Sequence, residues 1–71
     1  MTTPTVTRGT VEEFDEGRGL GVIRTPEGVR YPFHCTAIAG GSRSIPVGAD
    51  ALFTVVPGHS GRWEAASLHR I

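Results

Sequence analysis

The side chains best suited to metal binding or nucleophilic chemistry in this sequence are the adjacent His34 and Cys35. His59 and His69 are the candidates that would complete a metal site with them. Neighbouring residues of a strand point to opposite faces, however, and the sequence has no Cys-x-x-Cys or His-x-x-x-His spacing. We therefore expect no metal and no cofactor, interpret Cys35 as a small apolar residue, and do not expect an enzyme.

Carboxylates are the other group that could do chemistry, because paired carboxylates serve in acid–base catalysis. Four of them surround Phe14, namely Glu12, Glu13, Asp15 and Glu16. No second polar cluster nearby suggests a substrate pocket. We interpret this segment as a solvated strand end and turn, partly neutralised by Arg18.

The segment Arg18-Gly19-Leu20-Gly21-Val22-Ile23 carries the pattern most closely tied to binding. Its alternation places Leu20 and Val22 on one face of a strand and Gly21 and Ile23 on the other. Glycines at this spacing indicate a backbone that stays uncrowded on one face. The segment matches the RNA-binding pattern Lys/Arg-Gly-aromatic-Gly-aromatic except at the two aromatic positions, whose rings stack on bases in that pattern.

The second informative segment is Tyr31-Pro32-Phe33-His34-Cys35. Tyr31 and Phe33 share one face of the expected strand, and Pro32 and His34 share the opposite face. Pro32 lacks a backbone N–H, so it belongs on a sheet edge or at an irregularity.

The fold that positions these segments is predicted to be all-β, with five strands. Strands are predicted over residues 5–14, 19–25, 29–34, 51–56 and 63–69, after a frayed tail at 1–4. Gly9 predicts a bend or a close backbone approach, and residues 26–28 and 57–61 predict turns. A single helical turn capped by Thr36 is expected at 36–39, followed by a flexible loop at 40–44.

The last two strands are expected to contribute part of the core and one outer pair. The predicted inward side chains are Ala51, Phe53, Val55, Ala66 and Leu68. Val56 and Trp63 are predicted to face each other across the strands on the outer surface. The single tryptophan would then be exposed.

Composition limits the chain to one small domain, residues 1–71, with a thin margin of stability. Seven arginines balance seven carboxylates, so the chain lacks the bulk positive charge that drives non-specific binding to phosphates. One cysteine allows no internal disulfide and suits a reducing compartment. No apolar run reaches membrane-spanning length, so a cytoplasmic protein with no membrane partner is expected.

The order of motifs resembles the bacterial cold-shock domain from about residue 8 to residue 71. The matching segments are Gly9-Thr10-Val11-Glu12-Glu13-Phe14-Asp15, Arg18 to Ile23, Phe33-His34-Cys35-Thr36-Ala37-Ile38, Val47-Gly48 and Glu64-Ala65-Ala66. The resemblance implies a five-stranded antiparallel OB-fold barrel that binds single-stranded RNA or DNA on its second and third strands. It also implies weak RNA-chaperone activity.

The family's stacking rings are largely replaced here. Leu20 and Val22 stand where the family has phenylalanines, as do Pro32 and Cys35, and Glu13 stands where it has tryptophan. Losing three platforms removes about 3–9 kcal/mol of stacking. We therefore predict weak, salt-dependent binding through Phe14, Arg18, Leu20, Val22, Arg30, His34 and Arg43.

A protein-interaction or self-association module of the same fold is the alternative. Its partner surface would be an apolar patch, rimmed by charges, of Leu20, Val22, Pro32 and Cys35. A second patch would contain Val56 and Trp63. The sequence leaves open which patch is used, and whether the partner is a second copy of the chain.

Overall fold

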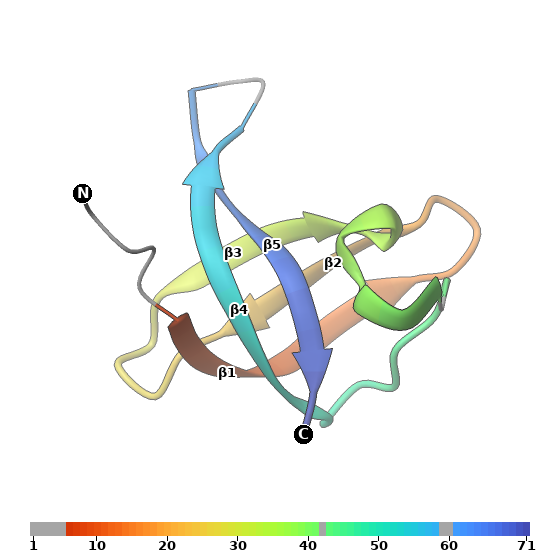
Figure 1. Cartoon of the computed structure of the whole chain (residues 1–71), viewed down its shortest axis with the longest axis horizontal. Coiled ribbons are helices and arrows are strands. Elements are labelled where there is room, and N and C mark those ends of the chain that lie inside the picture. The colour runs from red at the N-terminus through yellow and green to blue at the C-terminus, as the bar shows by residue number, and fades with distance from the viewer. Residues whose placement is uncertain (1–5, 42, 59–60) are drawn as a thin grey trace.

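The computed structural model describes residues 6–41, 43–58 and 61–71 and contains five antiparallel strands in one sheet. Their order across the sheet is β3-β2-β1-β4-β5 (Figure 1). The elements are β1 (Val6–Asp15), β2 (Leu20–Arg24), β3 (Arg30–His34), the short 3₁₀ turns η1 (Cys35–Ala37) and η2 (Ala39–Gly41), β4 (Asp50–Pro57) and β5 (Trp63–Arg70). The predicted all-β class is confirmed.

Some sequence-based predictions fall outside the described residues. They concern the tail at 1–4, the strand start at Thr5, position 42 of the loop, and His59 and Ser60 of the last turn. In the part of the chain that the structure covers, no helix has the length and apolar character needed to cross a membrane.

Strand β1 lies at the centre of the sheet and bends so that each half pairs with a different neighbour. Residues 6–10 pair with β4, and residues 10–15 pair with β2. Gly9 lies in the bend, where a Cβ atom would come within 2.8 Å of the Arg24 carbonyl oxygen and 3.0 Å of the Phe53 ring. The predicted close backbone approach at Gly9 is therefore confirmed.

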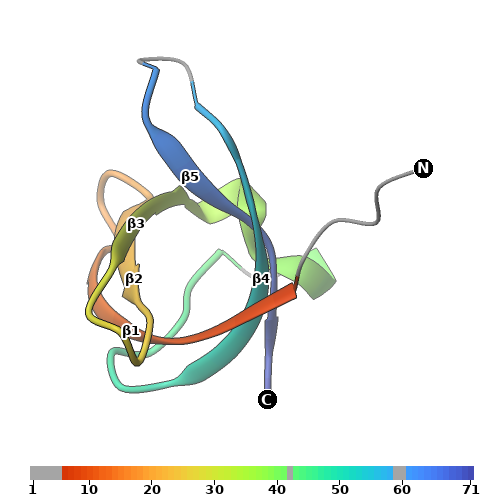
Figure 2. The same ribbon diagram turned by 90° about the vertical axis from the view of Figure 1, so that its left-hand side faces the viewer.

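The sheet curls strongly (Figure 2), and its two end strands, β3 and β5, come into contact. A parallel bridge between Ile38 and Leu68 attaches the segment after η1 to β5. Apolar side chains from all five strands and from two loop positions fill the interior of the curl. The buried apolar residues are Val11, Ile23, Phe33, Ile38, Ile45, Ala51, Phe53, Ala65 and Leu68.

A β-bulge in β1 determines which face each of its side chains occupies. The register with β2 shifts between Val11 and Glu13, so Glu12 is the extra residue. Across a bulge, two side chains that lie on the same face of a strand are three positions apart instead of two. Val11 and Phe14 therefore both face the core, and Glu13 points outward.

A second irregularity has the same effect on β5. The β4–β5 register shifts between Leu52 and Thr54, next to Ser67, which has a φ of 53°. Ala65 and Leu68 are both buried although they are three residues apart. The predicted inward position of Ala66 was therefore wrong, because Ala65 occupies the core and Ala66 is half-buried.

Two further predictions need correction. Val56 pairs with Glu64, and Trp63 pairs with Pro57, so Val56 and Trp63 point to opposite sides of the hairpin and do not form the expected pair. Trp63 is nevertheless exposed, as predicted. The cap of η1 is His34 instead of Thr36, since the His34 side chain accepts a hydrogen bond from the Thr36 backbone N–H.

Candidate nucleic-acid interface

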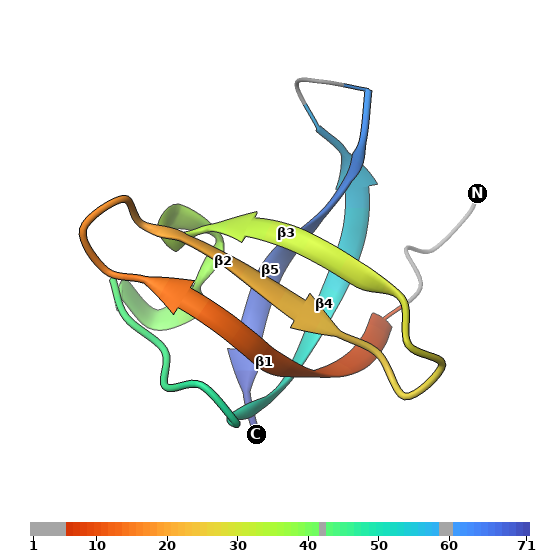
Figure 3. The same ribbon diagram turned by 180° about the vertical axis from the view of Figure 1, so that it is seen from behind.

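The exposed side of strands β1, β2 and β3, which lie side by side at the front of Figure 3, presents rows of side chains that run across the strands. The row of Thr10, Arg24 and Arg30 lies beside two rows that border a groove. Asp15, Leu20 and His34 form one row, and Glu13, Val22 and Pro32 form the other. We call these six residues the outer face. Leu20, predicted to share a face with Val22, is 48% exposed.

The packing on the inward side of these strands explains why β2 has a glycine at position 21. Phe14, Gly21 and Phe33 lie in one inward row, and the two rings stack with centroids 5.9 Å apart and an interplanar angle of 9°. A Cβ atom on Gly21 would lie 2.5 Å from the Phe33 ring and 2.8 Å from the Glu13 carbonyl oxygen. A glycine between Leu20 and Val22 is thus what allows the Phe33 ring to pack directly beneath β2.

A groove of about 890 Å³ is lined by the outer face and by the β4–β5 hairpin. Five of the seven predicted site residues line this groove, which are Phe14, Arg18, Leu20, Val22 and His34. Phe14 is half-buried and contributes its ring from the core side of the sheet. The other four are exposed or half-buried on the outer face and the adjoining turn.

The hairpin contributes Val56 and Glu64 to the same groove. Val56 was predicted only as part of a separate patch with Trp63, and Glu64 was not predicted as a site residue. These positions are distant from β2 and β3 along the chain. They reach the groove because the sheet curls and brings β5 against β3. Only a prediction of the curl and of the β4–β5 register would have found them.

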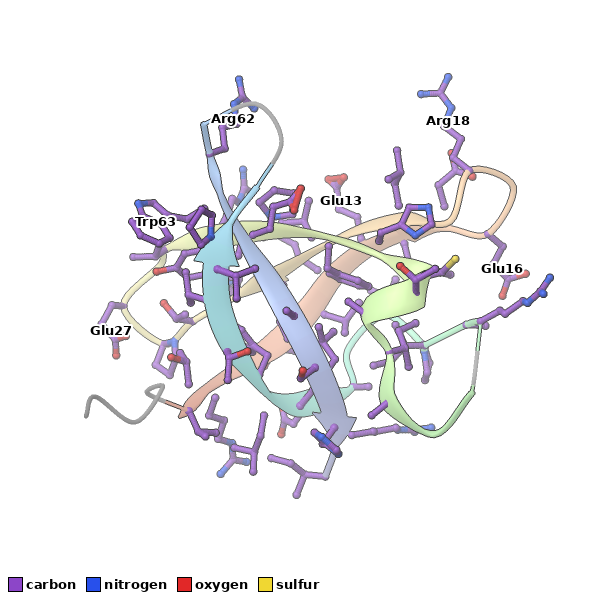
Figure 4. All side chains as sticks on the ribbon, turned by 45° about the horizontal axis from the view of Figure 1, so that its top comes forward. Glu13, Glu16, Arg18, Glu27, Arg62 and Trp63 are labelled. Atoms are coloured by element: carbon purple, nitrogen blue, oxygen red, sulfur yellow. The ribbon has the colours of Figure 1, made fainter. Side chains whose placement is uncertain are left out.

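Arg18 is the cation of the groove. It lies on the turn between β1 and β2, apart from Arg62 and Trp63 of the β4–β5 hairpin (Figure 4). Its Nε is 3.9 Å from Oδ2 of Asp15, and the two side chains are 78% and 58% exposed. A contact this long and this solvated is weak, so the guanidinium can exchange Asp15 for another anion at little cost.

Arg30, also predicted as a site residue, lies on the same side of the strands but does not line the groove and is paired with Glu12. Its Nε donates to Oε2 of Glu12 at 3.0 Å, and its Nη2 donates to Oε1 of the same carboxylate. This bidentate contact lowers the pKa of Glu12, with hydrogen bonding as the larger cause, and raises the pKa of Arg30. Glu12 is in this position because it is the extra residue of the β1 bulge.

Arg43 and Cys35 lie beside a second, smaller hollow next to η1. Thr36 lines both hollows, so the two are neighbours. Cys35 is half-buried, packs against the core, and has its Sγ 3.8 Å from Nδ1 of His34. Of the predicted apolar patch, Leu20, Val22 and Pro32 therefore line the groove, and Cys35 does not.

His34 is held in a defined orientation at the end of β3. Its Nδ1 accepts a hydrogen bond from the Thr36 backbone N–H at 3.2 Å and lies 2.9 Å from the Thr36 hydroxyl oxygen. Because Nδ1 acts as an acceptor, we assign the proton of the neutral ring to Nε2. The imidazole can therefore donate a hydrogen bond from Nε2 to a ligand in the groove.

The groove also carries acidic side chains. Glu13 is exposed on the outer face, and Glu64 is half-buried on the hairpin. Within residues 6–41, 43–58 and 61–71, neither carboxylate has a hydrogen-bond or ion-pair partner. Across the same ranges, no three His, Cys, Asp or Glu side chains lie close enough together to hold a metal ion.

Neither the protein-family models nor the curated proteins contain a match to this chain. The structure defines its class as a small all-β protein with five antiparallel strands in a single sheet.

Proposed function

We propose that this chain is a divergent cold-shock-type protein whose OB-fold barrel binds single-stranded RNA or DNA in the groove beside its outer face. The observation that carries the proposal is the convergence of Arg18, Leu20, Val22 and His34 on one groove. These residues come from the two segments on which the resemblance depends. The curl of the sheet and the contact between β3 and β5 support the barrel.

Bases and phosphates would contact different parts of the groove. Leu20, Val22 and Pro32 offer an apolar surface to a base, and aliphatic contact replaces ring stacking there. Arg18 and the Nε2–H of His34 are the donors suited to phosphate oxygens. Such a surface supports weak binding and, at most, a modest loosening of RNA secondary structure.

Removing single cations tests this assignment. Arg18→Ala should weaken binding of a mixed-sequence RNA heptamer and reduce the slope of log K against log salt by about 0.7, the value for one phosphate contact on a single strand. Arg70→Ala is the matched control, because Arg70 is also exposed but lies at the C-terminal end of β5, opposite Ala51, and does not line the groove. Fluorescence anisotropy at several salt concentrations measures both quantities.

Equal losses for the two variants would assign the binding to general charge and refute the proposed groove. No binding by the unmodified protein at low salt would refute nucleic-acid binding altogether.

A protein-interaction or self-association module is the second candidate, and one observation favours it. Among the described residues, the groove carboxylates Glu13 and Glu64 have no hydrogen-bond or ion-pair partner, and they repel phosphates. A partner for this groove would be an apolar segment with basic side chains. Sedimentation of the protein across a wide concentration range tests self-association, and a groove variant such as Leu20→Glu should abolish it.

A further inference from the structure

The position of Glu13 suggests how the groove distinguishes one base from another. We propose that Glu13 is a specificity-determining residue that favours guanine and disfavours uracil and thymine. This inference rests on the proposed function and names the ligand chemistry of the same groove.

Glu13 is placed to reach the edge of a base bound on the outer face. It lies directly opposite Val22 in the β1–β2 register, and Pro32 follows Val22 in the same row. Side chains directly opposite each other in antiparallel strands have Cβ atoms about 4.5–5.5 Å apart. A base resting on Val22 and Pro32 therefore has one edge within reach of the Glu13 carboxylate.

The bulge in β1 creates this arrangement. If β1 paired with β2 without a bulge, Glu12 and Phe14 would share the exposed face and Glu13 would point toward the core. Glu12 instead pairs with Arg30, so its charge is already satisfied. Among the residues described here, Glu13 has no hydrogen-bond or ion-pair partner, and its two oxygens are free to accept hydrogen bonds.

The chemistry of a carboxylate then ranks the bases. A carboxylate accepts hydrogen bonds and donates none. Guanine presents two adjacent donors, N1–H and the N2 amino group, which match the two carboxylate oxygens. Cytosine and adenine present one amino donor beside an acceptor, whereas uracil and thymine present a single N–H between two carbonyl oxygens that repel the carboxylate.

The same charge determines where the phosphates run. A phosphate chain beside Glu13 is repelled, so the backbone is expected to pass on the side of Arg18 and His34. The bases then point along the strands, from the row of Leu20 and His34 toward the row of Glu13, Val22 and Pro32, which is the orientation that presents their Watson–Crick edges to Glu13.

Single-base substitution in a uniform background tests the inference. The probes are labelled uridine heptamers whose central nucleotide is guanosine, inosine or uridine, measured by anisotropy at low salt. Inosine keeps N1–H but lacks the N2 amino group. The unmodified protein should bind the guanosine heptamer about five- to tenfold more tightly than the uridine heptamer, the lower range for a bidentate base contact, with inosine between them.

Glu13→Gln and Glu13→Ala should each remove most of this preference and strengthen binding of the uridine heptamer, because the repulsion is gone. Glu27→Gln, which makes the same charge change on the distant β2–β3 turn (Figure 4), should preserve the preference. Equal binding of the three heptamers, or a preference that persists in both Glu13 variants, would overturn the role of Glu13 alone. No binding of any heptamer would overturn the proposed function as well.

Discussion

Restoring a stacking ring at Leu20 should raise the affinity for single strands. Leu20 is 48% exposed at the start of β2, opposite His34, so a phenyl ring there has room and needs no rearrangement of the core. One aromatic platform contributes about 1–3 kcal/mol per stacked base. Because the ring would remain partly solvated beside Asp15, we expect a gain of about 1–2 kcal/mol, or about 5- to 30-fold in Kd, for Leu20→Phe.

The matched control is Leu52→Phe. Leu52 is 40% exposed, but it lies on β4 between Arg8 and His69, away from the groove. Anisotropy titration of a mixed-sequence RNA heptamer measures the affinities, and thermal unfolding checks that both variants remain folded. A gain for Leu20→Phe alone supports the reasoning. The same gain for both variants, or none for Leu20→Phe, would refute it.

Three other predictions follow from the packing and the charges. Gly21→Ala should cost about 1–3 kcal/mol of stability by overpacking against the Phe33 ring, whereas Gly17→Ala should cost little, since its nearest contact would be 3.4 Å away; chemical denaturation compares them. Hydrogen bonding from Thr10 and then Arg8 lowers the pKa of Asp50, so its contribution to stability is present above about pH 4 and is lost as the pH falls through the folded pKa. The difference in Tm between the unmodified protein and Asp50→Asn should therefore be largest near neutral pH and vanish in acid, and a constant difference would contradict this. The emission of Trp63, which is exposed and does not line the groove, should stay unchanged on oligonucleotide binding, and strong quenching would place the ligand outside the groove, against Trp63.

The alternation of side chains in β2 and β3 could be predicted directly from the sequence. Leu20 and Val22 face outward and Gly21 and Ile23 face inward, as a period of two requires. Both strands are short and pair without a bulge, so nothing interrupts the alternation. The outer face was predictable for this reason.

The sequence did not allow the same prediction for β1 or for the β4–β5 pair, that is, which side chains of β1 face the core and how β4 and β5 are aligned. Each pair contains an irregularity, and one extra residue moves every later side chain to the other face. This is why Phe14 lies on the core side and Ala65 replaces Ala66 in the core. The sequence around Glu12 and Ser67 contains no glycine that would indicate a bulge.

The pairing of Arg30 with Glu12 could not be predicted from the sequence either. The two residues belong to β3 and β1, which are separated by β2 in the sheet, and their contact depends on the bulge. Arg18 and Arg30 look equivalent in the sequence. In the fold, Arg18 has only a loose contact with Asp15, whereas Arg30 holds Glu12 with two hydrogen bonds.

The most direct test of the account is an NMR titration of the isotopically labelled protein with a mixed-sequence RNA heptamer at low and moderate salt. The account predicts shifts at the amides of Arg18, Leu20, Val22 and His34 that weaken as salt is added. Shifts concentrated on residues that do not line the groove, such as Leu52 and His69, or none at high ligand concentration, would contradict it.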